Sequence, residues 1–216
     1  LDDLETPRNG VSVLVAGCGT GRHALRLARY FNQMQVTAID LSLTSLAYAL
    51  WQAEKYRLNI DFIQGDILRA EMLGQTYDVI ESSGVLHHML VPEQGLNALI
   101  ERLRPGGVMK LALYSRQART LVRELRDELS GQIPETDAEI RTVREVLLQN
   151  QDQRWSAVLQ SSDFYSLSGC RDLLFHTQEH TFDLQEVRRL IEKSGLEWIG
   201  IVPPAGARKW RQKNYG

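Results

Sequence analysis

The 216-residue sequence contains only two cysteines, Cys18 and Cys170, which lie far apart in the chain. Two such cysteines fit neither a disulfide framework nor a zinc-binding spacing, so the sequence predicts a reducing, cytoplasmic environment. Charge of one sign is also missing. The formal net charge is −2, which argues against nucleic acid or an anionic membrane surface as a partner.

Long apolar runs are absent too, since none approaches the ~20 residues that span a bilayer. The opening LDDLETPRNG is polar and acidic, unlike a signal peptide. The sequence begins without Met and ends at KNYG, which suggests a fragment of a longer protein. With 43% hydrophobic and 24% charged residues, the composition is that of a globular protein.

From residue 11 to residue 114, strand-like runs alternate with helical patterns. Strands are expected at 11–17, 35–40, 61–66, 77–82 and 108–114. Three helices are expected between them, with buried faces formed by Ala24, Leu27, Ala28 and Phe31, by Leu43, Leu46, Ala47 and Leu50, and by Leu96, Leu99, Ile100 and Leu103. Ser42 should cap the second of these helices, Pro92 should open the third, and the glycines of PGG (105–107) should end it. This alternation predicts an α/β fold, a Rossmann-like doubly wound and mostly parallel sheet that binds its ligand at the carboxyl ends of the strands.

The pattern changes after residue 114. Two helices are expected around residues 118–129 and 140–147, followed by an irregular segment at 161–176. Alternation returns with a helix capped by Asp183 and a sixth strand at 196–202. We therefore expect a core formed by residues 1–114 and 181–216, with a helical and irregular insertion at 115–180 that covers the strand ends as a substrate cap. The alternative is a purely structural helical pair.

The glycine-rich turn after the first strand allows three ligands. A phosphate-binding P-loop is excluded because Arg22 and His23 follow Gly21 where Lys and Ser or Thr are required. A dinucleotide turn is disfavoured because Arg22 occupies the position of its third glycine, which argues against a nicotinamide oxidoreductase. The third candidate is S-adenosylmethionine.

Several motifs resemble those of the class I S-adenosylmethionine-dependent methyltransferases. In chain order they are VLVAGCGTG (13–21), AIDLS (38–42), GDIL (65–68), YDVIESSGVLHHM (77–89) and LRPGGVMKLALYS (103–115). The resemblance covers residues 11–114 and resumes at 182–202. It implies the class I methyltransferase fold with S-adenosylmethionine as cofactor.

The resemblance also implies which residues bind the cofactor. Asp40 is expected to accept hydrogen bonds from the ribose hydroxyls, Leu41 to lie against the adenine, and Asp66 to accept from the adenine amine. The full set is Gly17, Cys18, Gly19, Thr20, Gly21, Asp40, Leu41, Asp66, Ile67 and Ser82.

One position departs from the family pattern. Val15 stands where the family usually carries Asp or Glu for the methionine amine. Backbone carbonyls around Ala16 and Gly17, or the carboxylate of Glu81, are the candidates to replace it, and without such a replacement the affinity for the donor should be lower than usual. Val15 also favours the alternative function, a non-catalytic module that binds S-adenosylmethionine or S-adenosylhomocysteine.

Three further segments resemble bacterial methyltransferase domains associated with tetratricopeptide repeats. They are AIDLSLTSLAYA (38–49), LYSRQAR (113–119) and DFYSLSGCRDLLFHTQEHTFDL (163–184). This narrower resemblance suggests an acceptor that is a protein or peptide, although a small molecule stays open.

Methyl transfer from a sulfonium needs alignment of the acceptor, and a base only if the acceptor arrives protonated. His87 and Tyr165 are the candidates for a catalytic role, with packing as the alternative for each. Four residues are candidates for binding the substrate: Tyr114, Arg116, Arg171 and His176. For the arginines the alternative is a surface ion pair with Glu124, Asp127 or Asp172.

The segment HTQEH (176–180) formally matches a zinc-protease signature. That signature requires a helix and a further ligand, whereas this segment favours an extended chain. The sequence therefore predicts no metal site, and these side chains are expected to line the acceptor pocket.

Overall fold

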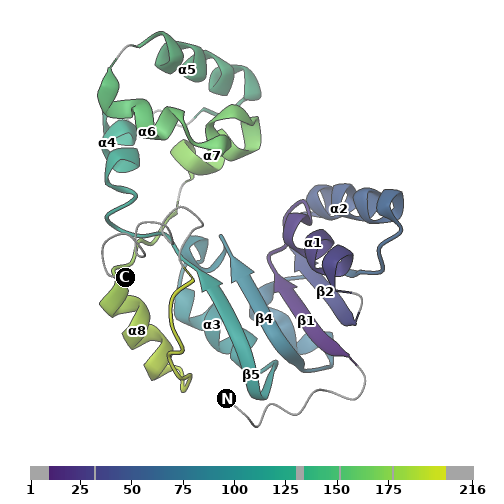
Figure 1. The fold of residues 1–216 in the computed structure, drawn as a ribbon. Helices are drawn as coiled ribbons and strands as arrows, with labels where there is room; N and C mark the ends of the chain where they lie inside the picture. Colours follow the sequence, from purple (N-terminus) through teal and green to yellow (C-terminus); the bar gives the residue numbers. More distant parts are fainter. Residues whose placement is uncertain (1–9, 32, 130–133, 151, 177, 203–216) are drawn as a thin grey trace, which may run out of the picture. The chain divides into compact units, whose positions relative to one another are not determined.

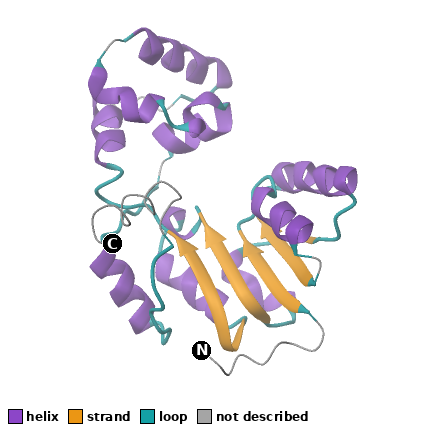
Figure 2. Cartoon of the chain, viewed as in Figure 1, coloured by secondary structure: helices purple, strands orange, loops and turns teal. Residues whose placement is uncertain are grey.

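The structure is a computed structural model that describes residues 10–31, 33–129, 134–150, 152–176 and 178–202. Its centre is a five-stranded, all-parallel sheet with the order β3-β2-β1-β4-β5 (Figure 1; Figure 2). The strands are β1 (Val11–Ala16), β2 (Met34–Asp40), β3 (Asp61–Gln64), β4 (Tyr77–Ser83) and β5 (Leu103–Ala112). The predicted fold class is therefore confirmed. Among the described residues, no helix is long and apolar enough to cross a bilayer.

Helix α1 (Arg22–Tyr30) packs on the sheet through small side chains. Ala24 is fully buried and joins Val15, Val36 and Ala38 in one apolar cluster. Phe31, predicted to be part of this face, is 52% exposed. The helix has already ended there, because Phe31 is its C-cap residue, so the prediction was wrong at that position.

Helix α2 (Leu43–Tyr56) begins as predicted at Ser42, whose side chain accepts a hydrogen bond from the Ser45 amide. Of its predicted buried face, only Leu46 is confirmed. Leu46, Ala49 and Ala53 are buried, whereas the predicted Leu43, Ala47 and Leu50 are exposed. A Cβ added to Gly21 would lie 2.6 Å from the Cβ of Ala49. Because this approach admits only small side chains, Leu43 and Leu50 lie on the exposed side of the helix.

The segment before β5 also differs from the prediction. Helix α3 (Pro92–Ile100) has the expected proline in its first turn and buries Leu96 and Leu99. Leu103 belongs to β5, which starts earlier than predicted and runs through residues 105–107. The pairing with β4 shifts register between Tyr77 and Val79, and this irregularity accommodates the glycines within the strand.

The insertion is helical and has an apolar core of its own. Its helices are α4 (Thr120–Glu128), α5 (Asp137–Gln149), α6 (Ser156–Leu159) and α7 (Leu167–Phe175), with 3-10 helices η3 (Gln153–Trp155) and η4 (Ser162–Tyr165). Trp155, Phe164 and Cys170 lie at the centre of this core, each at most 1% exposed. As predicted, Ile140 and Leu147 contribute the buried side of α5.

The irregular segment predicted at 161–176 is instead mostly helical. Ser166 caps α7 by accepting a hydrogen bond from the Gly169 amide at 3.0 Å. The prediction failed because Ser166, Ser168 and Gly169 are typical of loops, while serine is equally typical of the residue that starts a helix.

The chain divides between Asp183 and Leu184 into two compact units. The second unit contains α8 (Leu184–Lys193), which begins directly after Asp183 as predicted. Residues 196–202 form no strand, so the sixth strand was predicted wrongly. Gly200 interrupts the run, and a glycine inside a strand weakens it.

Candidate active site

The glycine turn connects β1 to α1 at the carboxyl end of the sheet. Gly17, Gly19 and Gly21 all adopt left-handed conformations, with φ of 74°, 52° and 80°. The amides of Gly17 and Cys18 both donate to the carbonyl of Ile39, at 2.8 and 3.0 Å. Because these amides are used within the chain, they are not free to cradle a phosphate, which agrees with the exclusion of a P-loop.

The three glycines have different surroundings. A Cβ at Gly17 would lie 2.1 Å from the Cγ2 of Val85, and one at Gly21 would meet Ala49. A Cβ at Gly19 would have nothing within 4 Å. Gly17 and Gly21 therefore serve packing, while the space above Gly19 is open to a ligand.

This difference gives a first prediction. Gly17→Ala should lower the free energy of unfolding by about 1–3 kcal/mol more than Gly19→Ala, because both variants share the unfavourable φ and only the first collides with Val85. Urea unfolding of the two variants measures the difference. Equal destabilisation would contradict the packing role of Gly17.

Asp40 is the last residue of β2 and its carboxylate braces the turn. Its Oδ2 accepts from the Gly19 amide at 2.7 Å, and its Oδ1 accepts from the Ser42 amide at 2.8 Å. Each carboxylate oxygen has two lone pairs, so capacity remains for hydroxyl donors. The adjacent Leu41 is 67% exposed, which leaves an apolar surface beside the open space at Gly19.

The remaining predicted cofactor residues lie at the same edge of the sheet. Asp66 follows β3 and caps the 3-10 helix η1 (Ile67–Leu73), its Oδ1 accepting from the Leu68 amide at 2.9 Å. Ile67 is 6% exposed and belongs to the core. Thr20 is exposed in the glycine turn.

Two predicted side chains near the turn are polar or ionisable, with Ser82 buried and Cys18 half-buried. Ser82, near the end of β4, is buried, and its Oγ has no hydrogen-bond partner among the described residues. Burial, followed by the charge of Asp40, raises the pKa of Cys18 to about 12, so this thiol stays neutral. The unpaired Ser82 hydroxyl is the kind of group that a ligand would satisfy.

Glu81 lies beside Val15, the position at which the family's acidic residue is missing. The two residues are paired in register on β4 and β1. The carboxylate of Glu81 is almost fully buried, with Lys110 Nζ at 2.8 Å from Oε1 and His23 Nδ1 at 3.1 Å from Oε2. His23 belongs to α1, so the carboxylate faces the side of the sheet on which the glycine turn leads into that helix.

An aromatic stack follows β4. His87, in the 3-10 helix η2 (Leu86–His88), is 1% exposed and stacks on Tyr114 with ring centroids 3.8 Å apart. Burial, followed by the neighbouring charge of His88, lowers the pKa of His87 to about 3. Burial also raises the pKa of Tyr114 to about 12, so both side chains are neutral near pH 7.

The other predicted acceptor-side residues lie in several places. Tyr165 is 57% exposed at the end of η4. Arg116 donates to Asp183 Oδ2 at 3.3 Å, and Arg171 donates to Asp137 Oδ1 at 3.4 Å. Both arginines thus form ion pairs, but with other partners than those expected. Tyr114 and His176, by contrast, both lie close to His88.

The insertion contains a buried ion network that the sequence did not predict. Glu179 accepts hydrogen bonds from Arg119 and from Arg126, and its side chain is 5% exposed. Burial alone would raise the pKa of Glu179, but the hydrogen bond and charge of Arg119 and the charge of Arg126 lower it. Glu179 is the acid of the HTQEH segment, and residues 178–180 of that segment are not helical. No local pattern signals the network, because Gln178 and His180 on either side of Glu179 are polar as well.

Comparison with known proteins gives a family match in the N-terminal half of the chain. Residues 13–107 match the sequence family described as "Methyltransferase domain". The fold is that of a class I methyltransferase. S-adenosylmethionine, the cofactor predicted from the sequence, is the methyl donor of this fold class.

Two relatives match parts of this chain by sequence. An uncharacterized protein of Synechococcus sp. is 30% identical over 204 residues, which cover 88% of this chain and 48% of that protein. The malonyl-[acyl-carrier protein] O-methyltransferase of Halalkalibacterium halodurans is 31% identical over 116 residues, covering 52% of this chain and 41% of that enzyme. The chain thus spans at most about half the length of either relative.

A solved structure extends the similarity through the insertion. PKMT2 from Rickettsia typhi, determined in complex with AdoHcy, superposes with a TM-score of 0.63 at 19% identity. The superposition covers 95% of this chain and 44% of PKMT2. At this identity, the match establishes the fold and nothing more specific.

Proposed function

We propose that this protein transfers a methyl group from S-adenosylmethionine to an acceptor molecule. The observation that carries the proposal is the turn in which Asp40 holds the Gly19 amide while the space above Gly19 stays open. Asp40 would bind the ribose, Leu41 and Asp66 the adenine, and Ser82 a polar group of the bound nucleoside. These residues come from the ends of β2, β3 and β4, where a doubly wound sheet binds its ligands.

Glu81 would bind the methionine amine in place of the acid that Val15 lacks. Its carboxylate lies in register beside Val15 and is held in place by His23 and Lys110. A buried carboxylate with fixed neighbours is preorganised, so it binds an ammonium group with little loss of side-chain entropy.

When bound, S-adenosylmethionine supplies a methyl group already activated on a sulfonium. The chain then has to align an acceptor and exclude water. His87 is neutral and enclosed, so we assign it to shaping the acceptor side together with Tyr114, with which it stacks.

We further propose that the insertion 115–180 selects the acceptor as a cap on the core. Its helices pack around their own apolar cluster, and α7 brings Asp172 next to His88 of the core. A protein or peptide acceptor, and attachment to tetratricopeptide repeats in the full-length protein, remain predictions from the sequence resemblance.

Calorimetric titration tests the cofactor assignment. S-adenosylmethionine and S-adenosylhomocysteine should bind with one site per chain, and NADH should not bind. Incubation of a cell extract with the protein and isotopically labelled donor, followed by mass spectrometry, then tests methyl transfer. Binding without any labelled product would support the non-catalytic alternative, and absence of binding would refute both.

The role of Glu81 gives a second prediction. Glu81→Gln should weaken binding of S-adenosylhomocysteine about tenfold, because a neutral amide loses the charge-assisted bond to the ammonium group. Binding of methylthioadenosine should be unchanged, because that nucleoside has no amino acid part. Calorimetry with both ligands separates the outcomes, and an equal loss for both would place Glu81 elsewhere in the site.

A further inference from the structure

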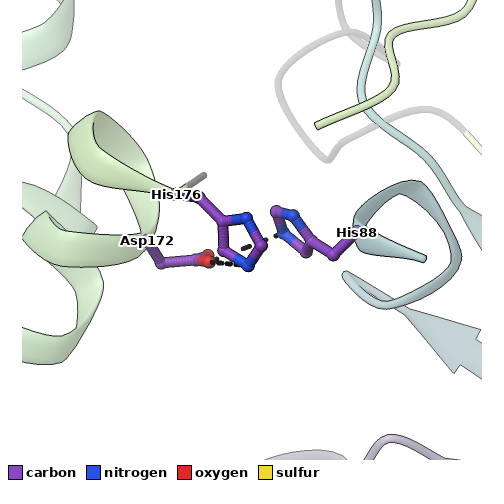
Figure 3. Close-up of side chains that lie close together, drawn as sticks. All are labelled: His88, Asp172 and His176. Carbon is purple, nitrogen blue, oxygen red and sulfur yellow. Dashed lines mark ion pairs between the residues drawn. The ribbon is translucent and has the colours of Figure 1, made fainter. Parts of the chain in front are cut away.

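Three side chains from two distant parts of the sequence, His88 and the pair Asp172 and His176, converge between the core and the insertion (Figure 3). His88 ends the 3-10 helix after β4, Asp172 lies on α7, and His176 caps the end of that helix. His88 Nε2 lies 3.5 Å from Asp172 Oδ1, and His176 Nε2 lies 4.0 Å from the same oxygen. The potential ligand atoms of the three residues all lie within 4.8 Å of one another.

The tautomer of His88 follows from its second ring nitrogen. Nδ1 lies 3.0 Å from the carbonyl oxygen of Gln178, and a carbonyl can only accept, so Nδ1 carries a proton. In the neutral ring, Nε2 then presents a lone pair toward Asp172. This nitrogen is buried and has no hydrogen-bond partner among the described residues. Two electron-rich atoms thus face each other, and a cation between them would relieve the arrangement.

The separations favour a metal ion over a proton as that cation. A proton shared between nitrogen and oxygen draws the two atoms to about 2.8 Å. Ligands at about 2.0–2.2 Å from a tetrahedral ion lie about 3.4 Å from each other. The 3.5 Å separation matches the second value, and the 4.0 Å separation requires only a small movement of His176.

The surroundings resemble the outer shell of a metal site. Ligating histidines commonly donate their other N–H to a carbonyl, as His88 does to Gln178, and ligating carboxylates are themselves hydrogen-bonded. Tyr114 donates to Asp172 Oδ2 at 3.4 Å, which leaves Oδ1 for the ion. Asp172 and His176 are partly exposed, which allows an ion and water to enter.

We propose that His88, Asp172 and His176 bind a divalent transition-metal ion of the Zn²⁺ class, with water completing the coordination. Two imidazoles and one carboxylate suit such ions better than Mg²⁺ or Ca²⁺, which prefer oxygen ligands alone. His176 Nδ1 accepts from the Gln178 amide at 3.2 Å, so ligation through Nε2 shifts this ring to its other tautomer. We therefore expect His88 and Asp172 to contribute more than His176. Since one ligand precedes the insertion and two lie in it, the ion would fasten α7 to the segment after β4.

The proposal is independent of cofactor binding and is tested with metal alone. After chelator treatment and dialysis, Zn²⁺ should bind in calorimetry with one ion per chain, and Co²⁺ should give the visible absorption of a tetrahedral site. His88→Ala and Asp172→Asn should each weaken Zn²⁺ binding by about tenfold or more. His180→Ala is the matched control, since His180 belongs to the same segment as His176 but not to the cluster.

Folding of each variant is checked by its melting temperature in chelator, which should stay close to that of the wild type. Zn²⁺ should then raise the melting temperature of the wild type and of His180→Ala but not of the other two variants. Absence of stoichiometric Zn²⁺ and Co²⁺ binding to the wild type would overturn the proposal. So would an equal loss of affinity in His180→Ala.

Discussion

Replacing Glu179 by Ala is expected to lower the free energy of unfolding by about 3–5 kcal/mol, because removing one partner of a buried ion pair leaves the other charge uncompensated. The charges left behind are those of Arg119, whose side chain is 7% exposed, and of Arg126, whose side chain is 20% exposed. Arg119 also donates to the carbonyl of Leu173 at 3.0 Å, as does Arg126 at 2.9 Å, so the network joins α4, the end of α7 and the segment after it. Urea unfolding followed by circular dichroism measures the loss.

Two controls make this expectation specific. Glu128→Ala removes an ion pair with Arg154 in which both side chains are about half exposed, and should change stability by less than about 1 kcal/mol. The double variant Arg119→Met with Glu179→Leu removes the two most buried charges of the network and should recover much of the stability lost in Glu179→Ala. If Glu179→Ala proves as mild as Glu128→Ala, the network does not stabilise the insertion.

Asp40→Ala is expected to weaken binding of S-adenosylhomocysteine by about 1–3 kcal/mol, roughly tenfold to a hundredfold. The substitution removes the acceptor that we propose for the ribose hydroxyls and also the hydrogen bond to the Gly19 amide. Methylthioadenosine should lose the same factor, because it contains the same ribose, in contrast to the effect expected for Glu81→Gln. Calorimetry with both ligands measures the two losses.

Asp61→Ala provides the control for Asp40. Asp61 is an exposed aspartate at the start of β3, at the opposite end of the sheet from the glycine turn. The Asp61→Ala variant should bind S-adenosylhomocysteine and methylthioadenosine as the wild type does. Asp40→Asn keeps an oxygen for the Gly19 amide but loses the acceptor for the Ser42 amide, so it should melt closer to the wild type than Asp40→Ala does and still bind more weakly. Wild-type affinity in both Asp40 variants would mean that the nucleoside binds elsewhere.

The sequence predicted the features that depend on local periodicity. β1 to β4, the cap at Ser42 and the proline start of α3 all follow from patterns within about ten residues. The glycine turn was readable because its left-handed residues leave a sequence signature. The place of Asp40 at the end of β2 follows from the same strand pattern.

Two of the features that failed, the buried face of α2 and the extent of β5, depend on tertiary contacts. The buried face of α2 is set by the approach of Ala49 to Gly21, and the extent of β5 by a register shift against β4. Neither contact can be read from a local pattern. The cluster brings His88 next to Asp172 and His176, which lie more than 80 positions further along the chain. No short motif links residues that far apart, and the sequence therefore predicted no metal site.

The contact between Ala49 and Gly21 links side-chain size at two positions that lie 28 residues apart in sequence. A larger residue at either position pushes α2 away from the bend that leads into α1, and Asp40, which connects to both through Ser42 and Gly19, moves with them. Substitutions that fit the proposed site to bulkier donor analogues therefore have space around Gly19 and Leu41. Positions 21 and 49, by contrast, have to keep their small side chains, because α2 approaches the start of α1 there.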